Sequence, residues 1–242
     1  MAAARRADDH PAAALEELRR LDRAKSQFVS IASHELRSPI AVVHGIASTL
    51  YVRGDDLTPE QLRDLRLTLH AQTTRLHDLA EQLLDLSRLE AGAYPFAPCP
   101  IRPREQLERL LPDLAVDRLA EIELAIDPDV EITTDPAGFE RVASNLVTNA
   151  LRYGRPPISI RSHVDDDFRL VVEDRGEGVA PDFVPRLFER FTRGDTSRRR
   201  SEGAGLGLAI AHQFACALGG DLRYEPAAPH GARFILVLPR AA

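Results

Sequence analysis

The chain has 242 residues, of which 44% are hydrophobic and 28% are charged, and its net charge at pH 7 is −6. This composition is typical of a globular protein with one or two domains, and the negative charge argues against general nucleic-acid binding. The longest apolar runs, such as 234–238, are too short to cross a bilayer, so no membrane segment is expected in this chain. The first residues also lack the apolar stretch of a secretory signal. Cys99 and Cys216 have neither zinc-site nor disulfide spacing, which favours a reducing compartment such as the cytoplasm.

Two long helices are predicted in the first 91 residues. The first covers about residues 12–52, where large apolar side chains recur at helical spacing. The sequence RGDDLTPEQ (53–61) then interrupts the pattern. Within this break Thr58 suits an N-cap, Pro59 suits the first helical turn, and Gln61 completes a capping box. A second helix is therefore expected to begin at this point.

The second helix carries a seam of leucines. Nine positions from 62 to 90 follow one another in steps of three and four, and seven of them are leucine: Leu62, Leu65, Leu69, Leu76, Leu79, Leu83 and Leu86. The exceptions are Gln72 and Glu90. A repeat sustained over this length is typical of a coiled-coil seam. We expect a homodimer in which two hairpins form a four-helix bundle; a hairpin packed on its own second domain is the alternative.

The remainder of the chain has a different pattern. Prolines at positions 95, 98, 100 and 103 predict an extended linker over 92–104. Helices are expected near 137–153, 182–191 and 205–218, and six segments have strand-like composition: 122–126, 130–134, 158–164, 168–173, 221–224 and 233–239. The predicted fold is an antiparallel helical hairpin followed by an α/β sandwich. The predicted boundaries are an N-terminal helix or linker over 1–25, the hairpin over 26–91, the linker over 92–104 and the second domain over 105–240.

Two glycine-rich segments in the second domain are candidates for nucleotide binding. VEDRGEGV (172–179) directly follows a predicted strand, and EGAGLGLAIA (202–211) directly precedes a predicted helix. Glycines before a helix let backbone amides approach a phosphate, and a helix N-terminus favours negative charge. Either segment alone is a weak signal, because similar spacings occur at ordinary junctions between elements.

A third segment, RVASNLVTNALRYG (141–154), places Asn145 and Asn149 on one face of a predicted helix. Asparagine is a poor helix former, so two buried amides on one face cost stability unless they have partners. Neutral amide oxygens suit Mg²⁺ held between the oxygens of a triphosphate. Capping of neighbouring backbone groups is the alternative role for both amides.

Together with FVSIASHELRSPI (28–40) and LFERFTRGD (187–195), these segments resemble the transmitter core of a sensor histidine kinase. The resemblance covers about residues 25–240. In the order of the chain, the segments are similar to the family's H box, N box, first glycine box, phenylalanine box and second glycine box. The resemblance implies a phosphotransfer hairpin, a Bergerat-type ATP-binding domain, ATP and Mg²⁺ as cofactors, and a response regulator as partner. The chain is expected to be a soluble cytoplasmic kinase or the cytoplasmic portion of a longer membrane-bound sensor.

The resemblance also implies roles for individual residues. His34 would accept the phosphoryl group, and Glu35 would act as a base or fix the imidazole tautomer. Asp174 would accept a hydrogen bond from adenine, and Asn149, with Asn145 beside it, would ligate Mg²⁺. Residues 192–202 would form a lid over the nucleotide. Further contacts with phosphates, base or ribose are implied for Arg152, Tyr153, Gly176, Gly178, Arg193, Gly203, Gly205 and Gly207.

Two positions depart from the family pattern. Arg152 stands where the family usually has lysine, and Lys25 is the single lysine among the 31 basic residues of this chain. Arginine in place of lysine at position 152 agrees with the scarcity of lysine in this chain, although the two cations are not equivalent at a phosphate. Ser38 stands four residues after His34, where phosphatase-competent members carry threonine or asparagine, so phosphatase activity is left open. Pro39 removes a helical hydrogen bond beside this site, which predicts a bent or loosened helix.

Three alternatives to an active kinase are considered. A pseudokinase scaffold would dock a partner without transferring phosphate. An ATPase of the same superfamily, of the chaperone or mismatch-repair type, would need a glutamate where this chain has Asn145. A phosphatase-dominant member would depend on Ser38. Among the other histidines, His77 precedes Asp78 but lacks the surrounding motif, so no role is assigned to it.

Overall fold

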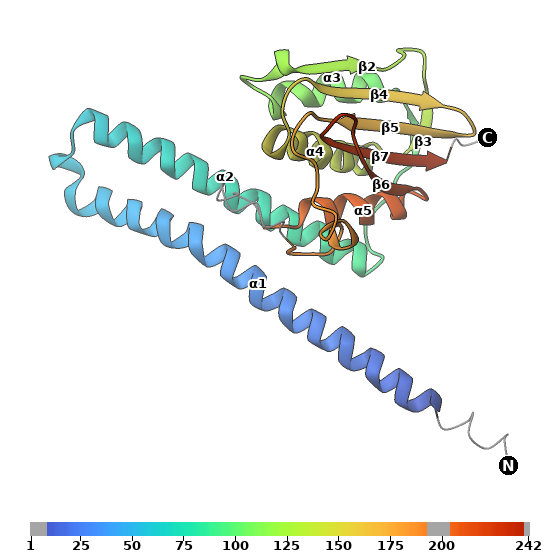
Figure 1. The fold of residues 1–242 in the computed structure, drawn as a ribbon. Coiled ribbons are helices and arrows are strands. Elements are labelled where there is room, and N and C mark those ends of the chain that lie inside the picture. The colour runs from blue at the N-terminus through green and yellow to red at the C-terminus, as the bar shows by residue number, and fades with distance from the viewer. Residues whose placement is uncertain (1–8, 193–203, 240–242) are drawn as a thin grey trace. The chain divides into compact units, whose positions relative to one another are not determined.

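The computed structural model describes residues 9–192 and 204–239, and for residues 9–28 it describes only the backbone. By internal contacts the chain divides into two units, Met1–Leu83 and Leu84–Ala242. Figure 1 shows the elements of both units, which are described separately here. Within the ranges given above, none of the helices combines the length and the apolar character that crossing a membrane requires.

The first unit is a helical hairpin. Helix α1 (Asp9–Arg53) is followed by the 3-10 turn η1 (Gly54–Asp56) and by helix α2 (Pro59–Glu90), whose last residues belong to the second unit. The predicted capping box forms, because the Thr58 amide donates to Gln61 Oε1 at 2.9 Å and the Gln61 amide donates to Thr58 Oγ1 at 3.2 Å. Helix α1 continues through Pro39, which is buried. The proline therefore does not end the helix.

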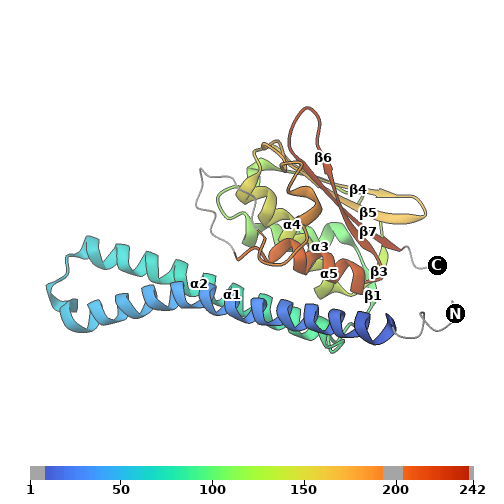
Figure 2. The same cartoon turned by 60° about the horizontal axis from the view of Figure 1, so that its bottom comes forward.

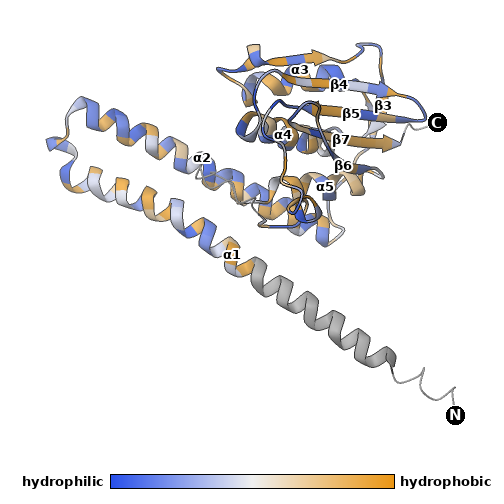
Figure 3. Ribbon diagram, in the orientation of Figure 1, coloured by the Kyte–Doolittle hydropathy of each residue, from blue (hydrophilic) through white to orange (hydrophobic). Residues whose placement is uncertain are grey.

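The leucine seam lies on the less exposed side of α2. Within the first unit Leu79 is buried, and the other seam residues are half-buried: Leu62, Leu65, Leu69, Gln72, Leu76 and Leu83. Other large apolar side chains of the hairpin stay in contact with solvent, since Val29, Ile40 and Leu67 are 54%, 51% and 60% exposed. Figure 3 shows how apolar and polar residues are distributed along α2 and along the coloured part of α1. One hairpin thus leaves apolar surface for a partner to cover.

The second unit contains a five-stranded sheet in the order β2-β4-β5-β7-β6. Its strands are β2 (Ile122–Ala125), β4 (Ile158–Val164), β5 (Asp167–Glu173), β6 (Asp221–Pro226) and β7 (Ala232–Pro239). The pair β2–β4 is parallel and the other pairs are antiparallel. Two short strands, β1 (Cys99–Ile101) and β3 (Ile132–Thr134), form a separate antiparallel sheet.

Helices cover one face of the larger sheet, as Figures 1 and 2 show. They are α3 (Pro103–Leu114), α4 (Pro136–Tyr153) and α5 (Gly207–Ala217). The core lies between this face and the helices. Along β7, for example, Ala232, Phe234, Leu236 and Leu238 are buried and alternate with more exposed residues. The prediction of a hairpin followed by an α/β sandwich is confirmed.

Two predictions about individual segments were wrong. The helix expected over 182–191 is only a 3-10 turn, η3 (Val184–Arg186). A further 3-10 turn, η2 (Leu119–Glu121), precedes β2. The segment expected to be an extended linker, 92–104, contains β1 and the start of α3. Pro103 occupies the first turn of α3, where its missing amide costs no intrahelical hydrogen bond.

Candidate functional site

The candidate phospho-acceptor lies on α1 of the hairpin. The His34 side chain is 77% exposed, whereas the Glu35 side chain is 14% exposed. His34 Nδ1 lies 3.9 Å from Glu35 Oε1, and Glu35 Oε2 lies 3.4 Å from Arg75 Nη2 on α2. The carboxylate is therefore held between the imidazole and an arginine of the other helix. Nε2 of His34 is the ring nitrogen that does not face Glu35.

A second imidazole–carboxylate pair lies on α2. His77 Nδ1 is 3.9 Å from Asp78 Oδ1, the same separation as in the pair on α1, but the Asp78 side chain is 63% exposed. Water screens an exposed pair more strongly than a half-buried one. The two pairs thus differ in the burial of the carboxylate, not in the distance.

Ser38 is exposed on α1.

Asn145 and Asn149 are half-buried on α4 of the second unit. The Asn145 side-chain amide donates from Nδ2 to the carbonyl oxygen of Arg141 at 2.7 Å. A methyl group in place of the Gly207 hydrogen would lie 2.8 Å from Asn145 Oδ1. The amide oxygen of Asn145 therefore faces the first residue of α5. The N-cap residue of α5 is Leu206, whose side chain cannot cap the first amides of that helix.

Asp174 follows β5 directly and is 4% exposed. Its Oδ1 accepts a hydrogen bond from the Gly176 amide at 2.7 Å, and its own amide donates to the Ala232 carbonyl at 3.0 Å. Burial raises the pKa of Asp174 above its ordinary value. Backbone hydrogen bonds of Gly176 and Ala232 oppose that rise, and the nearby charge of Glu173 adds to it. The hydrogen bond from Gly176 fixes the orientation of the carboxylate.

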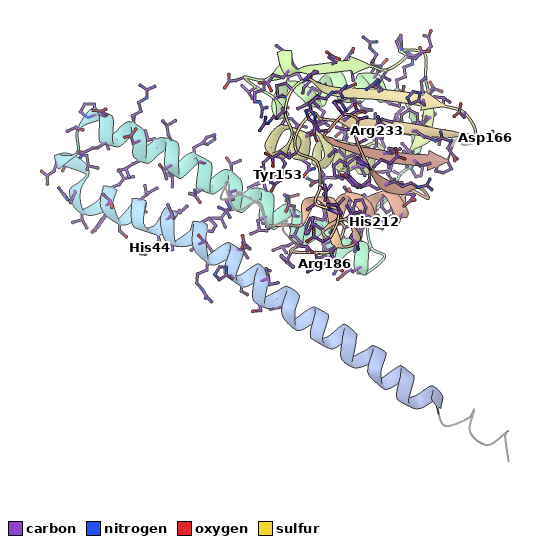
Figure 4. All side chains as sticks on the ribbon, in the orientation of Figure 1. His44, Tyr153, Asp166, Arg186, His212 and Arg233 are labelled. Atoms are coloured by element: carbon purple, nitrogen blue, oxygen red, sulfur yellow. The ribbon has the colours of Figure 1, made fainter. Side chains whose placement is uncertain are left out.

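The end of α4 packs against this carboxylate. A methyl group on Gly154 would lie 2.4 Å from Asp174 Cβ, and one on Gly176 would lie 3.1 Å from the Tyr153 carbonyl oxygen. Tyr153 itself is 51% exposed, and Figure 4 marks it at the end of α4; Arg152 is exposed beside it. The end of the N box thus contacts the first glycine box, just as Asn145 contacts the second.

The phenylalanine box joins the second glycine box through the backbone. The Phe191 amide donates to the Gly205 carbonyl at 2.8 Å. Gly178 and Gly205 have φ angles of 75° and 70°, a region that glycine adopts without strain. Arg193 and Gly203, together with most of the expected lid over 192–202, lie outside the described residues.

Two supporting residues next to Asp174 were not identified from the sequence. Glu173 is 4% exposed, and Arg233 reaches its Oε2 with both Nε and Nη2 at 2.8 Å; Figure 4 marks Arg233 on β7. Arg175 and Arg161 lie 3.4 and 3.7 Å from the same carboxylate. The feature of the sequence that could have identified Glu173 is its charge at the end of an apolar strand. Its partners follow only from the register of the sheet.

The donor set in the second unit fits a cation held by a nucleotide. Among the residues that the structure describes, no group of three or more histidine, cysteine or acidic residues could hold a metal ion. An amide oxygen that faces the N-terminus of α5, as Asn145 Oδ1 does, suits Mg²⁺ shared with phosphate oxygens.

Two family models match the chain. The first, described as the His Kinase A (phospho-acceptor) domain, matches residues 24–92, and the second, the histidine kinase-, DNA gyrase B- and HSP90-like ATPase, matches residues 134–242. The chain belongs to the sensor histidine kinase family. These two matches agree with the order of the hairpin and the sandwich along the chain.

Individual relatives support the same assignment. The kinase core is 31% identical to the signal transduction histidine-protein kinase AfsQ2 of Streptomyces coelicolor, over 90% of this chain and 42% of that protein. It is 38% identical to the phosphate regulon sensor protein PhoR of Pseudomonas aeruginosa, over 78% of this chain and 44% of that protein. The chain thus spans less than half the length of these relatives. The solved structure of the histidine kinase AdeS from Acinetobacter baumannii is similar with a TM-score of 0.68 and 26% identity, covering 86% of this chain and 98% of that one.

Proposed function

We propose that this kinase core transfers the γ-phosphoryl group of Mg-ATP to His34 and then to an aspartate of a response-regulator receiver domain. The main observation behind the proposal is that residues of the N box pack against residues of both glycine boxes. Asn145 contacts the first residue of α5, and Gly154 contacts Asp174. The match of residues 24–92 to the phospho-acceptor family supports the assignment of the acceptor to the hairpin.

The transfer is an in-line displacement at phosphorus. The lone pair of His34 Nε2 forms the new N–P bond while the bond from phosphorus to the bridging oxygen breaks, and ADP leaves with that electron pair. Glu35 lies on the Nδ1 side of the ring at 3.9 Å and holds or accepts the Nδ1 proton as positive charge develops. When bound, Mg²⁺ neutralises charge on the phosphate oxygens.

The second unit supplies the nucleotide site. Asp174 accepts a hydrogen bond from the adenine amine through the oxygen that Gly176 does not occupy. The oxygens of Asn149 and Asn145 ligate Mg²⁺. Arg152 contacts phosphate, and Tyr153 lies against the base or ribose. The glycines of the two boxes allow the backbone to approach the nucleotide.

A hydrolytic ATPase of the same superfamily is a weaker candidate. Such enzymes activate water with a glutamate, and Asn145 occupies the corresponding position in this chain. An amide cannot act as a general base at neutral pH.

The functional unit is proposed to be a homodimer in the cytoplasm. Val29, Ile40 and Leu67 stay more than half exposed in one hairpin, and a second hairpin would cover such side chains in a four-helix bundle. Cys99 and Cys216 are exposed free thiols, which suits a reducing compartment.

Radiolabelling tests the phosphotransfer. Incubation with Mg-[γ-³²P]ATP should give an acid-labile adduct that His34→Gln abolishes and His77→Gln retains. The two variants are matched, because both imidazoles lie 3.9 Å from a neighbouring carboxylate. An unchanged adduct in His34→Gln would overturn the proposal. Transfer from the labelled protein to a panel of receiver domains would then identify the partner.

A further inference from the structure

The end of α2 and the residues after it belong to the second unit, and the first two of them, Asp85 and Leu86, are buried; we call residues 85–97 the tether segment. Asp85 is 3% exposed and Leu86 is 0% exposed, although both belong to a helix that lies mainly in the hairpin. A buried carboxylate loses its hydration, which is costly unless the group is paired. The contacts of Asp85 therefore help to decide whether the tether segment stays in place.

Asp85 connects the tether segment to the helix that carries the candidate cation ligands. Asp85 Oδ2 lies 2.9 Å from Arg141 Nε on α4. The backbone carbonyl of Arg141 accepts the hydrogen bond from Asn145 Nδ2 at 2.7 Å. The side chain of Arg141 thus binds α2, and its backbone orients the amide that faces α5. Movement of Asp85 would displace the turn of α4 that orients Asn145.

Glu90 connects the same segment to the other side of the nucleotide site. It forms an ion pair with Arg190 of the phenylalanine box. The next residue, Phe191, donates its amide to the carbonyl of Gly205, two residues before α5 begins. The two acids of the tether segment therefore contact both segments that flank the phosphate end of the site.

Two later contacts hold the tether segment along α4 and α5. The Tyr94 ring packs edge-on against Phe214 of α5, with ring centroids 4.9 Å apart. The Ala97 amide donates to Asp135 Oδ2 at 2.8 Å, while Asp135 Oδ1 caps α4 through the Gly138 amide at 2.6 Å. The segment is thus attached to both helices that carry the nucleotide motifs.

We propose that Asp85 and Glu90 are positioning residues through which the end of α2 sets nucleotide affinity. This proposal rests on the proposed nucleotide site. Neither residue touches the nucleotide; each acts through an arginine on a segment that does. Because coupling between two sites is reciprocal, nucleotide binding also strengthens the attachment of the tether segment to the second unit.

Calorimetry with Mg-ADP on the full chain tests the coupling. Asp85→Asn and Arg141→Gln should each weaken Mg-ADP binding about 10-fold, within the range usual for coupled sites. The double variant should weaken binding by less than the two single effects combined, because both changes remove the contact between Asp85 and Arg141. Asp78→Asn is the matched control, since Asp78 is a 63% exposed aspartate of the same helix, and its affinity should equal that of wild type.

Hydrogen exchange provides the readout that a purely structural role would not change. Added Mg-ADP should slow amide exchange of residues 85–97 in wild type, and this slowing should be lost in Asp85→Asn. If Asp85→Asn does not fold, Glu90→Gln replaces it with an expected weakening of about 3-fold, because Glu90 is 49% exposed. A lowered melting temperature with unchanged Mg-ADP affinity would overturn the inference. Absence of nucleotide binding in wild type would instead overturn the proposed function.

Discussion

His34, the proposed phospho-acceptor, and Asp174, the proposed adenine-binding residue, have opposite surroundings. The His34 side chain is 77% exposed on a helix surface, and its acidic neighbour lies 3.9 Å away, too far for a direct hydrogen bond. Asp174 is 4% exposed and already accepts a backbone hydrogen bond at 2.7 Å. The Asp174 carboxylate is thus buried and held by the backbone of its own turn, whereas the His34 side chain is accessible to solvent.

Because of this difference, changes at the two residues should affect two different quantities: nucleotide affinity and the rate of phosphoryl transfer. A preorganised buried site spends little free energy on ordering when it binds, so changes there should alter affinity. In the proposed function, His34 receives a phosphoryl group and passes it to a receiver domain, and burial of the imidazole would obstruct both steps. Changes around His34 should therefore alter the rate of transfer and leave nucleotide affinity unchanged.

The largest expected effect is on the acceptor side. Glu35→Gln removes the carboxylate that is proposed to accept or stabilise the Nδ1 proton as positive charge develops on the ring, so the rate of His34 labelling should fall about 100-fold or more. Affinity for Mg-ADP should stay at the wild-type value. Asp78→Asn alters the equivalent pair on α2 and should leave the rate unchanged. A loss of nucleotide affinity in Glu35→Gln would contradict the expectation that changes near His34 affect only the rate of transfer.

The next effect belongs to the nucleotide site. Asn149→Asp places a negative charge on the face of α4 where triphosphate oxygens are proposed to bind, and it should weaken Mg-ATP binding at least about 100-fold. Isothermal titration calorimetry measures this directly, with circular dichroism to verify that the fold is retained. Normal Mg-ATP affinity in this variant would refute the assignment of Asn149.

A smaller effect is expected where α4 meets Asp174. Gly154→Ala would set a methyl group 2.4 Å from Asp174 Cβ and 2.6 Å from the Ala150 carbonyl oxygen, so the variant should be destabilised by about 1–3 kcal/mol. Gly45→Ala is the control in the hairpin, because nothing lies within 4 Å of the added methyl group. Denaturant titration should show no loss of stability for that control. Equal stability of the two variants would contradict the close packing around Asp174.

The smallest effect is on stability as a function of pH. Because the pKa of Asp174 is raised in the folded state, the folded protein is penalised by ionisation of this carboxyl at pH values above that pKa. Without nucleotide, Asp174→Asn should therefore be slightly more stable than wild type at pH 7. The difference should shrink as the pH falls through the raised pKa and protonates the wild-type side chain. Thermal melts from pH 4 to pH 8 would reveal it, and a wild-type protein that is more stable at pH 7 would contradict the burial argument.

Much of the architecture could be predicted from periodicity and local chemistry. The capping box at Thr58 and Gln61 forms as expected because it depends only on four neighbouring residues. The six predicted strands were found because alternation of apolar residues is a local signal. The whole of α3 (Pro103–Leu114) was missed; its first turn was assigned to the linker because prolines were taken to exclude a helix, although Pro103 lies at that turn. The segment over 182–191 has helix-like spacing, but Pro185 lies in what is only a 3-10 turn.

The candidate site was predictable where its residues lie in contiguous motifs. Asn145, Asn149 and Asp174 belong to segments that can be identified one at a time. The supporting contacts depend on long-range packing: Arg233 meets Glu173 through the pairing of β5 with β7, and Arg141 meets Asp85 across more than fifty residues of chain. No local pattern encodes such pairs, so they required the folded structure.

The outer strand β6 has a consequence for the behaviour of the protein in concentrated solution. Strands at the edge of a sheet can pair with a second copy and nucleate aggregates. On β6, Asp221, Arg223 and Glu225 occupy alternate positions, and Arg223 Nε donates to Asp221 Oδ2 at 2.8 Å. Two-fold antiparallel pairing centred on Arg223 would set arginine against arginine and Asp221 against Glu225, and both combinations repel. The charges on β6 therefore disfavour this pairing between two copies of the chain.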